Sequence, residues 1–303
     1  MSSLNALKHP LGTHHPDGLP IPRNLIHIVP SHDELSDEFR QHLAALALEN
    51  PAWTQTIFSD AQAEEFIAAN FEPKYLDALS RIDAAYGPAR SDLMRYLIMY
   101  RLGGVYLDTK SGMDRPLSKI LQDDDEFIVS QWQNALGGIH ENIGFHPELN
   151  HVPGGEYQNW VIISRSGHPF LAAVIAAVMA NIEQYSVKRF GVGKNGVLRV
   201  TGPIAYTMAI EPILTQFQHR RVVCVEAGLL YAVTGGSQHH VLKHKLHYSR
   251  LSHSVVRPPN GAHWALHVRH ALERLVLMQL ARLRHWNRRR LNRRRVVVGR
   301  GLK

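Results

Sequence analysis

Asp92, Arg95 and Asp108 are the strongest chemical signal in this sequence. Asp92 and Arg95 are three positions apart, so on a helix they lie on one side of it. Such a pair alone is typical of an exposed, weak ion pair. Asp108 follows a short apolar run, and an acid at the end of an inner strand lies where α/β sheets bind their ligands. Together the three residues predict a polar ligand site.

The elements around these residues are well marked. Gly87 and Pro88 predict the start of a helix, and Gly103 with Gly104 predicts its end. The apolar run at 105–107 then reads as a short strand that ends at Asp108. The pattern therefore places the pair Asp92 and Arg95 on a helix and Asp108 at the end of the next strand.

Strands and helices alternate along the rest of the chain, which predicts a parallel or mixed sheet covered by helices. A Gly- and His-rich stretch at 134–156 reads as an insertion or lid. A further helix opens at Thr201. Strands are expected at 24–29, 53–58, 127–129, 160–163 and 221–225, and helices at 33–49, from 61 onward and at 169–185.

Length and charge divide the 303 residues into three parts. Residues 1–20 read as a flexible leader and 21–255 as one α/β domain, while 256–303 read as an amphipathic helix with a basic tail. Residues 282–303 hold nine Arg, one Lys and no acid, although the net charge of the whole chain is only +8. The rest of the chain is therefore slightly acidic, which argues against a general nucleic-acid-binding domain.

The composition also indicates the cellular location of the protein. The single cysteine, Cys224, cannot form an internal disulfide, and the first 20 residues lack the apolar core of a signal peptide. The longest apolar stretch, 170–180, is too short for the roughly 20 residues that a membrane span needs. We expect a cytoplasmic protein, peripheral on the inner face of the membrane if the basic tail binds anionic lipid. The tail reads equally well as a solvated end, and RNA binding by its arginines is the less economical interpretation.

A wider set of motifs resembles one known family: glycosyltransferases whose sugar-binding region carries a D-x-D motif, relatives of yeast-type mannosyltransferases and, more distantly, of clostridial glucosylating toxins. The resemblance runs in consistent order over roughly residues 21–250. It rests on Ile21-Pro22 before Leu25-Ile26-His27, on Asn50-Pro51, on Ala89-Arg90-Ser91-Asp92 with Arg95-Tyr96, on Gly103-Gly104-Val105-Tyr106-Leu107-Asp108, and on His168-Pro169 and Thr201-Gly202-Pro203.

The resemblance implies a GT-A-type, Rossmann-like nucleotide-sugar-binding fold with a mixed sheet flanked by helices. It implies transfer of a hexose, with retention, from a UDP- or GDP-sugar donor to a glycan or lipid-linked acceptor. By analogy the pathway is surface polysaccharide synthesis. Ser91, Asp92 and Arg95 would then grip the donor sugar, whose hydroxyls both donate and accept hydrogen bonds. Asp108 would be the first acid of the D-x-D motif.

This sequence departs from the motif at its third position, which is Lys110. A departing diphosphate is usually neutralised by a divalent cation, Mn²⁺ or Mg²⁺, held by carboxylates. Three interpretations stay open. Lys110 supplies its ammonium in place of the cation, Asp114 supplies the missing carboxylate, or the site binds donor without turnover.

Three further positions are weaker candidates for the site. His247 falls where the family has a histidine near its C-terminal active-site loop, and it would contact the cation or diphosphate. His27 would lie near the nucleoside, although a core histidine is the plainer interpretation. Asn159 would be a polar group at the sugar site or simply a turn residue. A zinc site through His240, His244 and His247 has suitable spacing but lacks an HExxH glutamate.

Two other function classes compete with an enzyme. One is a catalytically silent nucleotide-sugar-binding module, which the change at Lys110 would permit. The other is a membrane or nucleic-acid adaptor that acts through residues 282–303. Donor hydrolysis separates the first from an enzyme, and deletion of the tail separates the second.

Overall fold

The computed structural model describes residues 18, 20–33, 35–233 and 247–258. The chain divides after Val256. The expected leader at 1–20 therefore lies almost entirely outside the described residues, and so do the predicted C-terminal helix and basic tail, apart from their first residues. No described helix combines the length and the apolar character needed to cross a bilayer.

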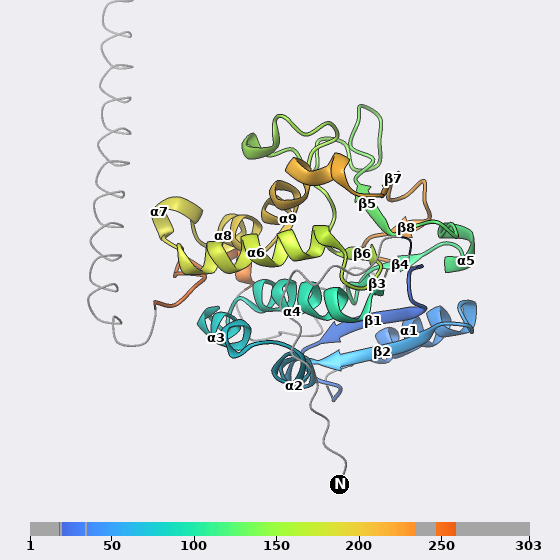
Figure 1. Ribbon diagram of the computed structural model, residues 1–303, viewed down its shortest axis with the longest axis horizontal. Helices are drawn as coiled ribbons and strands as arrows, with labels where there is room; N and C mark the ends of the chain where they lie inside the picture. Colours follow the sequence, from blue (N-terminus) through green and yellow to red (C-terminus); the bar gives the residue numbers. More distant parts are fainter. Residues whose placement is uncertain (1–17, 19, 34, 234–246, 259–303) are drawn as a thin grey trace, which may run out of the picture. The chain divides into compact units, whose positions relative to one another are not determined.

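A six-stranded mixed sheet forms the centre of the fold, in the order β2-β1-β3-β6-β5-β7 (Figure 1). Neighbouring strands are parallel except where β6 runs antiparallel to both β3 and β5. A separate two-stranded pair joins β4 (Gly112–Met113) to β8 (Leu229–Leu230). The strands of the large sheet are β1 (Asn24–Val29), β2 (Thr54–Ser59), β3 (Gly104–Leu107), β5 (Phe127–Gln131), β6 (Val161–Ser164) and β7 (Arg220–Val223).

Helices cover both faces of this sheet. They are α1 (Asp37–Glu49), α2 (Asp60–Asn70), α3 (Pro73–Arg81), α4 (Gly87–Leu102), α5 (Leu117–Ile120), α6 (Pro169–Glu183), α7 (Val187–Phe190), α8 (Gly193–Val200) and α9 (Pro203–Ile210). Short 3₁₀ turns are η1 (Pro147–Leu149), η2 (Glu211–Gln216) and η3 (Tyr248–Arg250). The α/β class with a mixed sheet flanked by helices, which the sequence predicts, is confirmed.

Alternation along the strands creates two separate cores, because successive side chains of a strand point to opposite faces. Ile26, Tyr106 and Ile162 belong to the larger core, which α4 and α6 cover. Leu25 and Val105 belong to the other, which includes residues of α1 and α5. The aromatic ring of Tyr106 is thus on the same side of the sheet as α4.

Helix α4 ends at the double glycine that the sequence indicates. Gly103 is the C-cap residue, with φ 64°, and Gly104 has φ 111°. Residues other than glycine rarely adopt these backbone conformations. A Cβ on Gly104 would lie 2.3 Å from the carbonyl oxygen of Asn24 in β1. Glycine therefore lets the chain leave α4 and enter β3 directly against β1.

Several element boundaries follow local signals, and others do not. Ser59 caps α2 through a capping box with Gln62, close to the predicted helix start. Helix α1 begins at Asp37, later than the predicted 33, because the Ser36 hydroxyl accepts a hydrogen bond from the amide of Phe39 and caps it there. Helix α3 and the short β4 and β8 were not predicted.

Candidate active site

Four segments distant in sequence meet at the end of β3. Leu107 pairs with Val161, so the residue that follows β3 and the residues that precede β6 lie at the same edge of the sheet. The amide of Asp108 donates to the carbonyl of Trp160 at 2.8 Å. Helix α4 and the C-terminal end of α8 complete the site. Antiparallel β6 thereby places Asn159 beside Asp108.

Arg95 joins the predicted site residues. Its Nη1 lies 3.0 Å from Oδ1 of Asp108, and its Nη2 lies 3.3 Å from Oδ1 of Asp92. The same Nη1 donates to the carbonyl of Asn159 at 2.8 Å, and Nη2 donates to the Ser91 hydroxyl at 3.3 Å. The guanidinium also lies over the ring of Tyr106, at 4.8 Å from its centroid. Asp92 and Arg95 are both 5% exposed, so an exposed ion pair is the wrong interpretation.

Asp92 is a buried carboxylate held by neutral donors as well as by Arg95. Asn159 Nδ2 donates to its Oδ1 at 3.0 Å, and the Thr201 hydroxyl donates to its Oδ2 at 2.8 Å. Burial raises the pKa of Asp92 to about 6, although Arg95 and Thr201 act to lower it. This carboxylate therefore ionises close to neutral pH.

Asp108 is the more accessible acid. Its side chain is 24% exposed, and its Oδ1 accepts from the Tyr106 hydroxyl at 2.9 Å as well as from Arg95. Both of these contacts are made by Oδ1. Among the described residues no partner is recorded for Oδ2, so this oxygen can accept a hydrogen bond from a ligand. Burial raises the pKa of Tyr106 far above its usual range, so its hydroxyl keeps the proton that it donates.

Lys110 contacts one ring of an aromatic cluster, which consists of Trp132, Trp160 and Tyr231. Its Nζ lies 4.4 Å from the centroid of the Tyr231 ring. That ring lies 5.3 Å from Trp132 and 5.4 Å from Trp160, centroid to centroid. The ammonium thus lies against the face of Tyr231, two residues from Asp108.

Some residues of this site were not predicted as site residues. Nothing in the sequence marked Tyr106 as a site residue, because an aromatic residue is ordinary within a buried strand. Thr201 was predicted only as the start of a helix or as a contact on the acceptor side. Tyr248 is a third: burial, together with the charges of Asp92 and Asp108, raises its pKa to about 12. A tyrosine after the matched His247 was the one available signal.

The remaining predicted residues lie elsewhere or in other roles. His27 is fully buried; its Nδ1 lies 3.0 Å from the carbonyl of Leu107, its Nε2 has no described partner, and burial lowers its pKa to about 4. The ring ties β1 to β3, and its contact with a nucleoside stays a prediction. Asp114 is engaged by Arg115 at 2.6 Å, which lowers its pKa. His247 is exposed and caps η3, while His240 and His244 lie outside the described residues.

The described side chains do not form a cation cage on their own. Within the described part of the chain, no three His, Cys, Asp or Glu residues are grouped to hold a metal ion. Asp108 offers one free oxygen, and the ammonium of Lys110 follows two residues later. Because Mg²⁺ and Mn²⁺ prefer several oxygen ligands, this donor set fits them poorly, and we derive no step through a cation.

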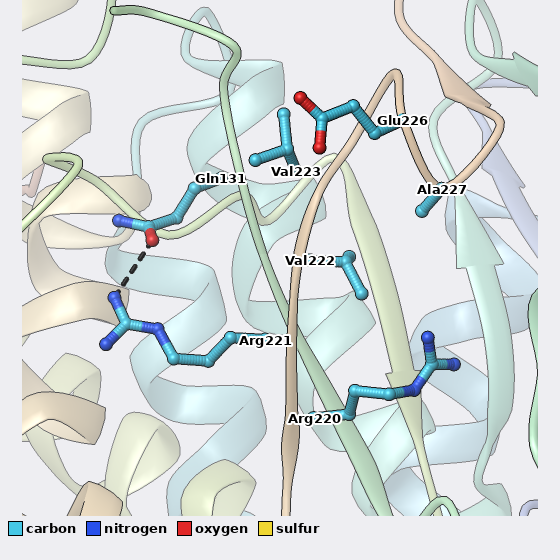
Figure 2. A pocket seen from close by; sticks show the side chains of 7 residues that line it. All are labelled: Gln131, Arg220, Arg221, Val222, Val223, Glu226 and Ala227. Atoms are coloured by element: carbon cyan, nitrogen blue, oxygen red, sulfur yellow. Dashed lines mark hydrogen bonds between the residues drawn. The ribbon is translucent and has the colours of Figure 1, made fainter.

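A hollow of about 430 Å³ lies away from these residues, along β5 and β7 (Figure 2). Arg221 donates to Gln131 Oε1 at 2.9 Å beside this hollow (Figure 2). Its lining residues are Gln131, Arg220, Arg221, Val222, Val223, Glu226 and Ala227. None of them belongs to the Asp92, Arg95 and Asp108 site.

Comparisons with known proteins agree with the predicted resemblance. Residues 36–127 match the family model described as a glycosyltransferase sugar-binding region containing a DXD motif. The chain is 25% identical over 203 residues to a mannosyl phosphorylinositol ceramide synthase of Saccharomyces cerevisiae, covering 64% of this chain and 50% of that protein. It is 33% identical over 129 residues to inositol phosphoceramide mannosyltransferase 3 of Schizosaccharomyces pombe, covering 42% of this chain and 28% of that protein. The chain thus spans half or less of the length of these relatives.

Among solved structures, the PaToxG glycosyltransferase has a TM-score of 0.47 at 16% identity, covering 65% of this chain and 71% of that one. The UDP-bound glycosyltransferase domain from the YGT toxin has a TM-score of 0.43 at 10% identity, covering 67% of this chain and 80% of that one.

Proposed function

We propose that this protein is a glycosyltransferase that moves a hexose from a UDP- or GDP-sugar to a lipid-linked or glycan acceptor. The observation that carries the proposal is the bridge that Arg95 makes between Asp92 and Asp108 at the end of β3. The family match over 36–127 contains all three residues. The lipid acceptors in the names of the yeast relatives favour a lipid-linked acceptor here.

In this proposal each polar group has a separate task. Asp92 and Arg95 bind hydroxyls of the donor sugar, because a carboxylate accepts and a guanidinium donates in fixed directions. Asn159 and Thr201 hold Asp92 in place through their hydrogen bonds. The tightly packed carboxylate can then act as a preorganised acceptor.

Lys110 and Asp108 act at the diphosphate end of the donor. Negative charge develops on the diphosphate as the bond to the sugar breaks, and a nearby ammonium stabilises it. The Tyr231 ring limits the positions that the ammonium can occupy. Retention of anomeric configuration, a role in surface polysaccharide synthesis and a cytoplasmic location at the inner membrane face remain parts of the proposal.

Donor hydrolysis tests the function. The purified chain is incubated with UDP- and GDP-sugars, with Mn²⁺ or with a chelator, and released nucleoside diphosphate is measured. We expect turnover with at least one donor and loss of about 100-fold or more in Asp108→Asn, typical of removing a group that acts on developing charge. Donor binding without turnover under every condition would contradict an enzyme.

That contradictory outcome would favour the second candidate, a silent nucleotide-sugar-binding module. The observation behind it is Lys110, which stands where the motif has its second acid. The poor fit of the described side chains to a cation supports the same alternative. Measured donor affinity with no released nucleotide would establish it.

A further inference from the structure

Exposed apolar side chains gather in the segment between β5 and β6. Among the described residues, four of the eight large apolar side chains that are exposed lie within ten positions of one another. Single exposed apolar residues are ordinary, whereas a cluster of them marks an interaction site. This apolar loop tip consists of Leu136 (93% exposed), Ile139 (68%), Phe145 (53%) and Ile143 (47%).

The segment that carries the apolar loop tip is held firmly from within. Asn134 Nδ2 donates to the carbonyls of Ile143 and Gly154, at 2.8 and 3.0 Å. Trp132 Nε1 donates to the buried carboxylate of Glu156 at 2.9 Å. Gly144, at φ 83°, packs so tightly that a Cβ would lie 2.7 Å from the Trp132 ring. The exposure of the tip is therefore built into the fold.

The apolar loop tip is connected directly to the candidate active site. Its segment begins at Trp132 and returns through Trp160, two members of the aromatic cluster whose Tyr231 ring contacts Lys110. Asn159, which bonds Asp92, directly precedes Trp160. In Figure 1 the segment between β5 and β6 projects beyond the sheet and its helices. The segment that carries the tip therefore begins and ends beside the site.

The low charge of the segment indicates what kind of surface the apolar loop tip binds. Residues 133–147 contain no Lys or Arg and a single acid, Glu141, whose carboxylate accepts from the amide of Gly137 at 3.1 Å. The amides of residues 138, 140, 141, 142 and 143 bond to carbonyls inside the segment. A segment with satisfied backbone groups and almost no net charge can enter an apolar layer at low desolvation cost.

The size of the patch argues against a protein partner. Four side chains expose on the order of a few hundred Å², less than the roughly 800 Å² per partner of a stable protein interface. Hydrocarbon needs no matching polar rim, so a small projecting tip is sufficient to enter it. We propose that the apolar loop tip inserts into the surface of a lipid layer and presents the active site to a lipid-linked acceptor. The acceptor part of this inference rests on the proposed function.

Vesicle flotation of the full chain tests the insertion. Vesicles of pure phosphatidylcholine in about 0.5 M salt are used, because salt at this concentration screens attraction between the basic tail and lipid headgroups. We expect the wild-type chain to float with the vesicles. The double variant Leu136→Asp, Ile139→Asp should lose about tenfold or more of the bound fraction, since two apolar side chains no longer leave water.

Leu48→Asp is the matched control, because Leu48 is 83% exposed on α1, away from the segment. It should float like the wild-type chain. All three positions are exposed, so thermal melting should be unchanged. Equal flotation of the double variant and the wild-type chain would overturn the proposal, as would failure of the wild-type chain to float. A wild-type dimer that the double variant dissociates would assign the tip to a second copy instead. Flotation uses no donor, so its result is independent of whether the chain turns over a nucleotide sugar.

Discussion

Asp92 sets the expected pH dependence of the site. Its pKa of about 6 means that protonation begins just below neutral pH, and the protonated acid loses its charged contact with Arg95 and the sugar. We expect donor hydrolysis to fall on the acid side with a midpoint near pH 6. A pH series of initial rates at saturating and limiting donor measures it.

Two variants identify Asp92 as the group responsible. Thr201→Val removes a hydrogen bond that favours the ionised acid, so the midpoint should move to higher pH. Asp92→Asn should abolish the fall of the rate on the acid side, together with most of the activity. An acid limb that stays at the same pH in Thr201→Val would assign it to another group.

The same raised pKa predicts a change in stability. The folded protein binds this proton more tightly than the unfolded chain, so the free energy of unfolding should fall as the pH rises from about 4 to about 6. Urea unfolding at several pH values measures the slope. Asp92→Asn should make the curve flatter across this interval, and an unchanged curve would contradict the assignment.

Lys110 distinguishes the three interpretations of the altered motif. If its ammonium stabilises the diphosphate, a chelator leaves wild-type turnover unchanged and Lys110→Ala lowers it by about 100-fold. Lys110→Asp restores the second acid of the motif, so we expect its residual turnover to become dependent on Mn²⁺. Wild-type turnover that the chelator abolishes would favour the cation instead. Released nucleoside diphosphate is the readout for each variant.

Tyr231 offers a control for the position of that ammonium. Tyr231→Phe keeps the aromatic face against Lys110 and should keep turnover, whereas Tyr231→Leu removes it and should lower kcat more than it raises KM. Equal loss in both variants would point to the hydroxyl rather than to the ring.

At the scale of elements, the connection between α4 and β3 is the most sensitive backbone feature. Gly104→Ala forces a side chain into a φ of 111° and toward the Asn24 carbonyl, so we expect a loss of about 2–4 kcal/mol in the free energy of unfolding. Gly87→Ala, at a position with no neighbour within 4 Å, should be neutral or stabilise by less than about 1 kcal/mol. Urea denaturation compares the two, and equal stabilities would contradict this account of the turn.

Local signals explain why many elements were predictable from the sequence. Some signals depend only on residues that are adjacent in the sequence, such as the apolar run at 24–29 and the glycines at 103–104. Strand β1 and the end of α4 lie where these signals predict them. The burial of Asp92 and Arg95 was not predictable, because their partners Asn159 and Thr201 come from segments more than 60 residues farther along the chain. Tyr106 and Thr201 joined the site through strand direction and helix contacts, which one sequence does not reveal.

At the scale of the whole molecule, the positive charge is concentrated in residues 282–303 and the proposed chemistry lies within residues 91–201. We expect deletion of 282–303 to leave donor hydrolysis within about twofold of the full chain, since none of the residues proposed to bind the donor lies in the deleted segment. Initial rates of both chains at physiological salt check this. Loss of hydrolysis on deletion would favour the adaptor over the enzyme.

The central claim is that Asp92 and Arg95 grip the sugar of a nucleotide-sugar donor beside Asp108. Calorimetric titration of the wild-type chain and Asp92→Asn with a UDP- or GDP-sugar, and with the matching nucleoside diphosphate, tests it most directly. We predict that the variant binds the nucleotide sugar about tenfold or more weakly and the nucleoside diphosphate unchanged. Equal weakening for both ligands, or no binding of any nucleotide sugar to the wild-type chain, would contradict the claim.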